Sequence, residues 1–338
     1  MFAPILEQIA SQKPLSRETA ANALEAILKG EVPVEAASAF LMGLRTRGET
    51  PEEIAGFVDV MSQHMEKVEL GDPDAIDVCG TGGDGKNTYN VSTTAAFILA
   101  AGGVTVAKHG NKAISSKSGS ADVLKALDVN IEMPPSQAKR CADELGVTFF
   151  FAPFYHPAMK VIAPIRHKLG IRTIFNMLGP LLNPAQVKRQ VIGTFSHASA
   201  QLIAETLAQQ GVQKAFVVHS QDGYDEVSPF APTQVLEVEG NHIVRTFEFT
   251  PPSSGQNLNP ADASGHSPQE NAEIIRQVLT GERKDAAREF AVLNAGFGFA
   301  VAGKTATIEE GITLANEIVD SGVAWTKLQA FVYLSNFV

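Results

Sequence analysis

Two glycine-rich loops constrain the fold of this chain more than any other feature of its sequence. The first, Asp77-Val-Cys-Gly-Thr-Gly-Gly-Asp84, follows an apolar run typical of a β-strand, and the second occupies residues 108–122 after another such run. Glycine lets a backbone approach an anion closely, and successive N–H groups or the start of a following helix then bind phosphate without a side chain. We therefore predict a phosphate-binding α/β protein, and we interpret neither loop as a Rossmann or Walker loop.

Positive charge gathers around these loops, although the formal net charge of the chain is −10. Residues 85–121 contain no Asp or Glu and four lysines, Lys86, Lys108, Lys112 and Lys117. Asp84 and Asp122 flank this stretch. Such a pattern suits a site for a polyanion and a divalent metal better than a nucleic-acid groove. The alternative is a Gly/Ser-rich surface loop with solvated lysines.

Bulk properties favour a cytoplasmic globular protein. The 338 residues, 44% of them hydrophobic, suffice for two domains or for one large domain with a satellite. The only cysteines, Cys79 and Cys141, cannot form a disulfide framework, so we expect a reducing compartment. We expect no membrane partner, because no apolar run approaches the ~20 residues that span a bilayer. We expect no nucleic-acid partner, because the chain is acidic overall.

The pattern of apolar residues changes along the chain from helical to α/β. The first 66 residues have helical spacing, with Ser16 as an N-cap and Thr50-Pro-Glu-Glu53 as a capping box. After Gly71-Asp-Pro-Asp74, short apolar runs alternate with helical patterns. We predict strands at residues 75–78, 104–107, 147–151, 191–195 and 215–219. We predict helices between them at residues 92–101, 120–127, 135–145 and 198–210, and a loop at residues 250–268.

A series of short motifs stands in the order and spacing of one enzyme family, the anthranilate phosphoribosyltransferases. The chain resembles this family essentially from end to end. The motifs are Gly80-Thr-Gly-Gly-Asp84, Asn90-Val-Ser-Thr93, Lys108-His-Gly-Asn111, Gly119-Ser-Ala-Asp122, His156-Pro-Ala-Met-Lys160, Gly170-Ile-Arg-Thr-Ile-Phe-Asn176, Gly179-Pro-Leu-Leu-Asn-Pro184 and Asp225-Glu226.

The resemblance implies a small all-helical N-terminal domain and a larger α/β domain, with a central, mostly parallel sheet flanked by helices, as in nucleoside phosphorylases. The helical domain would span residues 1–70, completed by about 164–188. Residues 71–163 and 189–338 would form the domain that binds phosphoribosyl diphosphate. The implied reaction moves the phosphoribosyl group of 5-phosphoribosyl 1-diphosphate to the amine of anthranilate, in tryptophan biosynthesis, and releases diphosphate.

Two alternatives share this fold. A pyrimidine-nucleoside phosphorylase handles ribose and phosphate, but its nucleobase motifs are not recognisable here, and Asp225-Glu226 favours a diphosphate donor. A noncatalytic nucleic-acid-binding paralogue would show a basic surface and lack the metal carboxylates, and the sequence shows neither feature.

The resemblance implies that the two glycine-rich loops and the residues between them bind the donor. The phosphoribosyl diphosphate residues would be Gly80, Gly83, Asp84, Thr88, Asn90, Val91, Ser92, Thr93, Lys108, His109, Gly110, Asn111, Lys112, Ala113, Ile114, Ser115, Ser116 and Ser120. Backbone N–H groups, hydroxyls and the Lys108 ammonium group are suitable partners for phosphate oxygens.

The implied metal ligands are Ser92, Asp225 and Glu226, which would hold Mg²⁺, two ions per monomer, with the donor. By themselves, adjacent carboxylates in a surface turn are usually solvated, and a serine at a helix start is usually an N-cap. Magnesium takes hard oxygen ligands and keeps several waters, so few protein oxygens are needed to stabilise a departing diphosphate.

For anthranilate, a planar amine with a carboxylate, the resemblance implies Gly80, Asn111 and Arg166. A guanidinium group can bind a carboxylate with two parallel hydrogen bonds. His109 and His156 would line the same region. We expect no covalent nucleophile, because an aromatic amine has a free lone pair and needs mainly positioning.

Two residues depart from the family pattern. Lys112 stands where the family usually has Arg, and Asp128 stands where a helix commonly ends in Gly. The resemblance and the Ala/Leu-rich faces of the first helices together predict a homodimer.

Overall fold

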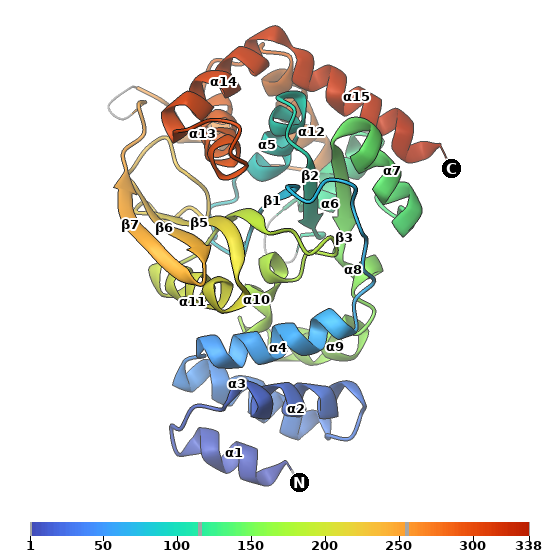
Figure 1. Ribbon diagram of the computed structural model, residues 1–338, viewed down its shortest axis with the longest axis vertical. Helices are drawn as coiled ribbons and strands as arrows, with labels where there is room; N and C mark the ends of the chain where they lie inside the picture. Colours follow the sequence, from blue (N-terminus) through green and yellow to red (C-terminus); the bar gives the residue numbers. More distant parts are fainter. Residues whose placement is uncertain (1, 114–116, 254–256, 338) are drawn as a thin grey trace.

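The computed structural model describes residues 2–113, 117–253 and 257–337. Four helices form one end of the molecule, and a sheet with helices on both faces forms the rest (Figure 1). The four helices are α1 (Ala3–Ala10), α2 (Arg17–Leu28), α3 (Val34–Arg47) and α4 (Pro51–Gln63). No helix in the described ranges is both long enough and apolar enough to cross a bilayer.

The predicted helix starts at Ser16 and Thr50 are confirmed. The Ser16 hydroxyl accepts a hydrogen bond from a backbone N–H in the first turn of α2. Thr50 and Glu53 form a capping box at the start of α4. The fully buried Glu53 carboxylate also pairs with Arg47 at the end of α3, so one side chain joins two helices.

The central sheet has seven strands in the order β3-β2-β1-β4-β5-β6-β7. Neighbours from β3 to β5 are parallel, whereas β6 and β7 are antiparallel. The carboxyl ends of five strands therefore meet at one edge, where ligands of open α/β sheets bind. The strands are β1 (Ile76–Gly80), β2 (Val106–Gly110), β3 (Val147–Phe151), β4 (Arg189–Gly193), β5 (Val212–Ser220), β6 (Thr233–Gly240) and β7 (His242–Phe249).

Helices connect and cover the strands. α11 packs on β5, β6 and β7, while α13 packs on α5 and on strands β1, β4 and β5. The remaining elements are α5 (Val91–Ala101), α6 (Ser120–Ala126), α7 (Pro135–Leu145), α8 (Ala152–Tyr155), α9 (Met159–Leu169), α10 (Phe175–Leu178), η1 (Gly179–Leu181), α11 (His197–Gln210), η2 (Pro260–Ala263), α12 (Pro268–Leu279), α13 (Ala286–Val301), α14 (Ile308–Ser321) and α15 (Val323–Asn336).

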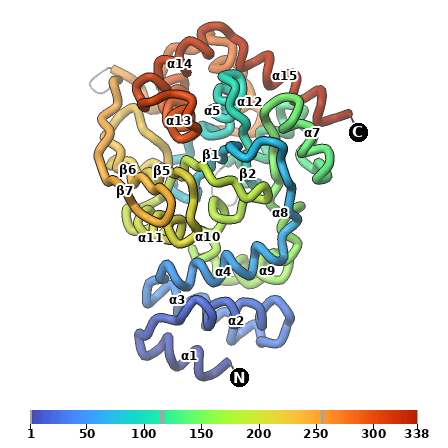
Figure 2. Tube along the Cα trace, viewed as in Figure 1, coloured from blue at the N-terminus to red at the C-terminus, as the bar shows by residue number. Residues whose placement is uncertain are grey.

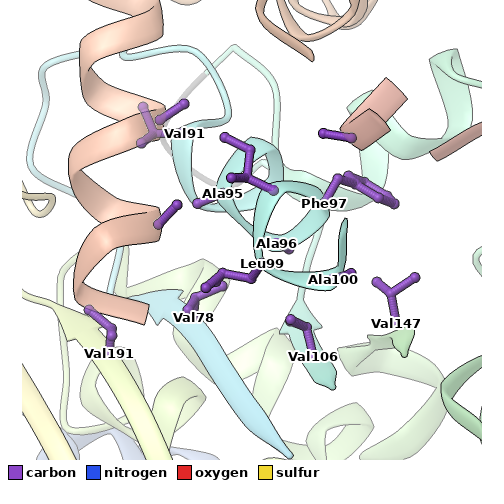
Figure 3. Close-up of a cluster of buried hydrophobic side chains, with 14 of the residues drawn as sticks. Val78, Val91, Ala95, Ala96, Phe97, Leu99, Ala100, Val106, Val147 and Val191 are labelled. Carbon is purple, nitrogen blue, oxygen red and sulfur yellow. The ribbon is translucent and has the colours of Figure 1, made fainter. Parts of the chain in front are cut away.

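The two faces of the sheet belong to different hydrophobic cores. Along β5, Phe216 and Val218 join the core beneath α5 and α13, and the alternate residue Val217 joins the core shared with the N-terminal helices. Figure 3 shows the first core, in which Val78 of β1 lies beside Leu99 of α5. This alternation is expected where both faces of a strand are buried.

The segment containing α9 and α10 returns to the N-terminal helices. α9 packs against α2 and α3, and α10 packs against α4. Figure 2 shows this part of the trace running beside α4. The segment therefore joins the bundle to the carboxyl edge of the sheet.

The predicted α/β class and the five parallel strands are confirmed, but their boundaries differ. The glycines that end β1 and β2 belong to the strands, and β4 begins two residues before its predicted start. The antiparallel pair β6 and β7 was not predicted, although β6 has buried apolar residues; β7 is mostly exposed. Residues 250–268 contain the short helix η2 within the predicted loop.

Candidate active site

The site lies at the carboxyl edge of the sheet, where β1 and β4 end side by side in Gly80 and Gly193. A Cβ added to Gly193 would lie 1.6 Å from the backbone oxygen of Asp225. A Cβ added to Gly80 would lie 3.0 Å from a carboxylate oxygen of the same residue. Two strand ends without side chains thus let the turn with Asp225 and Glu226 lie directly against the sheet.

The first glycine loop wraps around this turn. Gly82, Gly83 and Gly85 have φ angles of +65°, +82° and +76°, which favour glycine. The Asp84 carboxylate accepts hydrogen bonds from the Lys86 N–H at 3.0 Å and from the Asp225 N–H at 3.4 Å. The structure therefore brings together two features that lie 141 positions apart in the sequence.

Burial and neighbouring charges raise the pKa values of Asp225 and Glu226. Burial and then the charge of Asp84 raise the pKa of Asp225 to about 7. Burial and then the charge of Asp225 raise the pKa of Glu226 well above its usual value, while Lys108 opposes this shift. The turn is half-buried, which disfavours the alternative of a solvated surface turn. Such a cluster favours a bound cation.

Lys108 and Ser92 lie beside the carboxylates. The Lys108 ammonium group, only 3% exposed, donates to the Val78 carbonyl at 2.6 Å and to the Ser92 hydroxyl at 3.1 Å. The Ser92 backbone opposes the rise in the pKa of Glu226. Helix α5 begins at Val91, so Ser92 is not an N-cap, and its hydroxyl faces the site.

The start of α5 also carries hydroxyls and amides suited to an anion. The buried hydroxyls of Thr81 and Thr93 make no hydrogen bond within the described part of the chain. Asn90 donates to the Ser118 carbonyl at 3.1 Å and accepts from Asn271 at 3.0 Å. Thr88 forms a β-bridge with Ser264, a residue in the region expected to be loop.

Asp122 fixes the second glycine loop. Its carboxylate accepts from the N–H groups of Ala113 at 2.8 Å and Gly119 at 2.9 Å. Gly119 must lack a side chain, since its Cβ would lie 2.5 Å from the Asn111 oxygen. Ser120 donates to that same oxygen at 3.3 Å. The exposed Lys112 extends over the Phe151 ring, and the predicted donor residues Ile114, Ser115 and Ser116 lie outside the described residues.

A buried polar network lies behind the loops. The Asp77 carboxylate accepts from the His109 N–H at 3.2 Å and from the Asn183 amide at 2.8 Å. His109 Nδ1 donates to the Gly179 carbonyl at 2.9 Å, so His109 Nε2 accepts from His156 Nε2 at 3.2 Å. Burial lowers the pKa of His109 to about 3 and that of His156 to about 4, so both rings are neutral.

Arg166 of α9 packs on an aromatic ring. Its guanidinium stands over the Phe175 ring at 5.6 Å, and burial lowers its pKa. Within the described residues, no hydrogen bond or ion pair joins Arg166 to Gly80, to Asn111 or to a carboxylate. A partly buried cation without a carboxylate partner is suited to bind an anionic ligand.

Sequence reasoning missed three residues that hold the site. Arg172 donates to the Gly83 carbonyl and stacks on the Phe195 ring at 4.4 Å. Asn271 orients Asn90, and Asn294 bonds the backbone beside Glu226. Arg172 lies in a motif already noted, whereas Asn294 has a weaker signal, a single amide in an apolar helix.

Two segments of the chain match the residue patterns of Rossmann and Walker phosphate loops. Residues 80–85 fit G-x-G-x-x-G, but α5 begins only at Val91, so the third glycine does not open a helix. Residues 298–305 fit G-x-x-x-x-G-K-T, but Gly298 lies inside α13 and no strand precedes it. Neither segment therefore has the strand–loop–helix geometry of a Rossmann or Walker site.

A hard cation fits the donor set, although in the described ranges no group of three or more His, Cys, Asp or Glu residues is arranged to hold a metal by itself. Adjacent carboxylates and the Ser92 hydroxyl supply oxygens only, which magnesium and calcium prefer. The raised pKa of Asp225 marks negative charge that its surroundings do not neutralise.

Glycine loops, paired carboxylates and a helical bundle together define a transferase of phosphorylated sugars. Two family models match: "Glycosyl transferase family, helical bundle domain" over residues 3–65 and "Glycosyl transferase family, a/b domain" over residues 72–325.

Comparison with individual proteins narrows this class. The chain is 44% identical to an anthranilate phosphoribosyltransferase of Acetivibrio thermocellus, over 99% of this chain and 97% of that one. The Thermus thermophilus structure of the same name has a TM-score of 0.91 at 40% identity, covering 98% and 99% of the two chains. The Saccharomyces cerevisiae enzyme in complex with PRPP and Mg has a TM-score of 0.89 at 31% identity, covering 99% and 97%. This chain belongs to the anthranilate phosphoribosyltransferase family.

Proposed function

We propose that this protein transfers the phosphoribosyl group from 5-phosphoribosyl 1-diphosphate to the amine of anthranilate, in tryptophan biosynthesis. The bond from the anomeric carbon to diphosphate breaks, the amine nitrogen bonds to that carbon, and the amine loses a proton. The products are N-(5-phosphoribosyl)anthranilate and diphosphate.

The observation that carries this proposal is the contact between the first glycine loop and the Asp225-Glu226 turn. Asp84 of the loop accepts from the Asp225 N–H, and Gly80 lies beside the Asp225 carboxylate. One side of the site thus offers backbone N–H groups and hydroxyls to phosphate, and the other offers carboxylates to a cation. A diphosphate that departs with a bound cation needs both the phosphate donors and the carboxylates that hold the cation.

The donor lies, in this proposal, across the ends of β1 and β2. Residues 80–93 and 108–120 surround it, and the unpaired hydroxyl of Thr93 supports an anion at the start of α5. Lys108 adds positive charge and holds the Ser92 hydroxyl in place. Lys112, in place of the usual Arg, contributes charge without a planar fork.

Anthranilate lies, in this proposal, between the donor and α9. Arg166 binds its carboxylate, and Asn111 and Gly80 line the amine. The neutral His109 and His156 rings add no charge, so they suit an aromatic ligand.

Mg²⁺ fits the oxygens of Ser92, Asp225 and Glu226, and we propose two ions per monomer. When bound, it neutralises the charge that develops on the departing diphosphate. The protein's own share is to hold these oxygens in place and to keep the Lys108 ammonium group beside them.

The remaining proposals concern assembly and location. We propose that residues 1–70, completed by 164–188, form one domain, and residues 71–163 and 189–338 the other. The packing of α9 on α2 and α3 supports this division.

Val34 and Met42 of α3 are 46% exposed, which supports a homodimer through the helical end. Sedimentation showing a monomer at micromolar concentration would contradict it. We propose a cytoplasmic location because Cys79 and Cys141 are free, which suits a reducing compartment.

The decisive experiment mixes the protein with phosphoribosyl diphosphate, Mg²⁺ and anthranilate and follows the loss of anthranilate fluorescence. The double variant Asp225→Asn/Glu226→Gln should remain folded and lose most turnover. A matched control replaces Glu237 and Glu239 of β6, which pair with Lys214, by glutamine. No loss of fluorescence with the unmodified protein would refute the proposed function. Phosphorolysis of a pyrimidine nucleoside would instead support the phosphorylase alternative.

A further inference from the structure

Asn294 is the only amide side chain in α13, whose other polar residues, Arg288 and Glu289, lie in the first turn. It lies in α13, whose residues are nearly all buried, and its side chain is 5% exposed. Burying an amide is unfavourable unless its donors and acceptor are bonded. The partners of Asn294 therefore indicate why the residue is there.

All of its bonds go to two backbone residues. Asn294 Oδ1 accepts from the Val227 N–H at 3.0 Å, and Nδ2 donates to the Val227 carbonyl at 3.0 Å. Nδ2 also donates to the Phe290 carbonyl, one turn earlier in α13, at 2.8 Å. The last bond fixes the amide on its own helix, and the first two fix Val227 at both its N–H and its C=O.

Val227 directly follows Glu226, so the bond to its N–H sets the peptide plane between these two residues. That plane determines where the Glu226 side chain leaves the backbone. Ser92, Glu226, Gly193 and Asn294 also line one cavity of only 10 Å³. This is about the minimum for one water, so the turn has little space to shift.

We propose that Asn294 is a positioning residue for the metal carboxylates, holding the peptide between Glu226 and Val227 so that the Asp225 and Glu226 carboxylates face the donor diphosphate. This inference rests on the proposed function, and it assigns a role to a residue 68 positions beyond the turn. Gly193 has no side chain, so the carboxylate turn can approach the sheet. Asn294 of α13 holds the turn from the opposite side through its bond to Val227.

The test compares Asn294→Ala and Asn294→Ser with Gln137→Ala. Gln137 is a buried amide that donates to the Leu334 and Phe337 carbonyls at the far end of the molecule, so its loss also removes buried hydrogen bonds. The serine side chain is one bond shorter than asparagine, so it loses the paired bonds to Val227, but its hydroxyl and the vacated space admit water and limit the folding defect if the alanine variant fails to fold.

The main readout is binding without turnover: calorimetry of Mn²⁺ in the presence of pyrophosphate. Both Asn294 variants should lose about tenfold or more in affinity, since partners of metal ligands typically contribute 10–100-fold. Gln137→Ala should bind as the unmodified protein does, with a similar fall in melting temperature. In kinetics, the half-saturating Mg²⁺ concentration should rise about tenfold, while the KM for anthranilate stays within about twofold.

Unchanged Mn²⁺–pyrophosphate affinity in a folded Asn294 variant would overturn the proposal and leave Asn294 as a core residue only. Equal losses in Gln137→Ala would do the same, because they would trace to general destabilisation. If the unmodified protein itself did not bind Mn²⁺ with pyrophosphate, the proposed function would fail, whatever the variants did.

Discussion

The close approach of Gly193 to the carboxylate turn makes one substitution unusually informative. In Gly193→Ala, the new methyl group would lie 1.6 Å from the Asp225 backbone oxygen, where real contacts are almost never below 3.0 Å. The turn must therefore retreat by roughly 1.4 Å or the strand must bend. Overpacking of this kind costs about 1–3 kcal/mol, and for a chain of 338 residues the melting temperature should fall by about 1–4 °C.

Activity should fall much further than stability. A displacement of about 1 Å at a catalytic group typically costs on the order of 100-fold in rate. We expect kcat/KM to fall by about that factor and Mn²⁺–pyrophosphate affinity to fall with it. Fluorescence kinetics, calorimetry and thermal unfolding measure the three quantities on one preparation.

Gly179→Ala is the matched control. Gly179 has helical φ and ψ angles of −48° and −56°, and no atom lies within 4 Å of its added Cβ. Alanine there should be neutral or stabilise by up to about 1 kcal/mol. A Gly193→Ala enzyme with normal turnover would refute the argument that the bare strand end positions the carboxylates.

Three further predictions concern other parts of the site and fold. Arg166→Ala should raise the KM for anthranilate about 10- to 100-fold and that for phosphoribosyl diphosphate much less, with partial rescue by Arg166→Lys; equal effects on both substrates in steady-state kinetics would move Arg166 out of the acceptor site. His109 and His156 have pKa values below the ordinary 6.5, so their contribution to stability is complete above that pH and is lost as pH falls toward 4. Urea unfolding at pH 7.5 and 5.5 should show this loss, and His109→Gln should reduce it by about half. Asp128 has a left-handed φ of +63° after α6 and an exposed side chain, so Asp128→Gly should stabilise the protein by up to about 1 kcal/mol in the same assay.

The sequence predicted the elements whose signals are local. Capping residues at Ser16 and Thr50 marked helix starts, and buried apolar runs marked the five parallel strands. The hairpin of β6 and β7 was not predicted, although apolar residues occur in both strands, among them Val235 and Leu236 in β6 and Ile243 and Phe247 in β7. The apolar residues of β7 are mostly exposed or half-buried, so they do not mark a core strand.

The candidate site was predicted in its parts but not in its assembly. Residues of the glycine loops and the carboxylate turn stood in the family's motifs, and the structure brings Asp84 and Asp225 into contact. The surface position expected for the Asp225-Glu226 turn was wrong. Nothing near Asp225 in the sequence indicates that Gly80 and Gly193 let this turn lie against the sheet. The place of Arg166 beside Phe175 likewise depends on how α9 packs, which a single sequence does not reveal.

Two amides that hold the site share one physical property: each bonds backbone atoms of a distant segment. Asn183 donates to the Ala107 carbonyl, and Asn294 bonds Val227. A bond to backbone does not depend on the side chain at the receiving position, so no complementary residue appears there in the sequence. The receiving segments keep their main-chain geometry while their own side chains face the ligand. The support of this site therefore comes from amides on helices and connecting segments, and the chemistry comes from the loops that those amides hold.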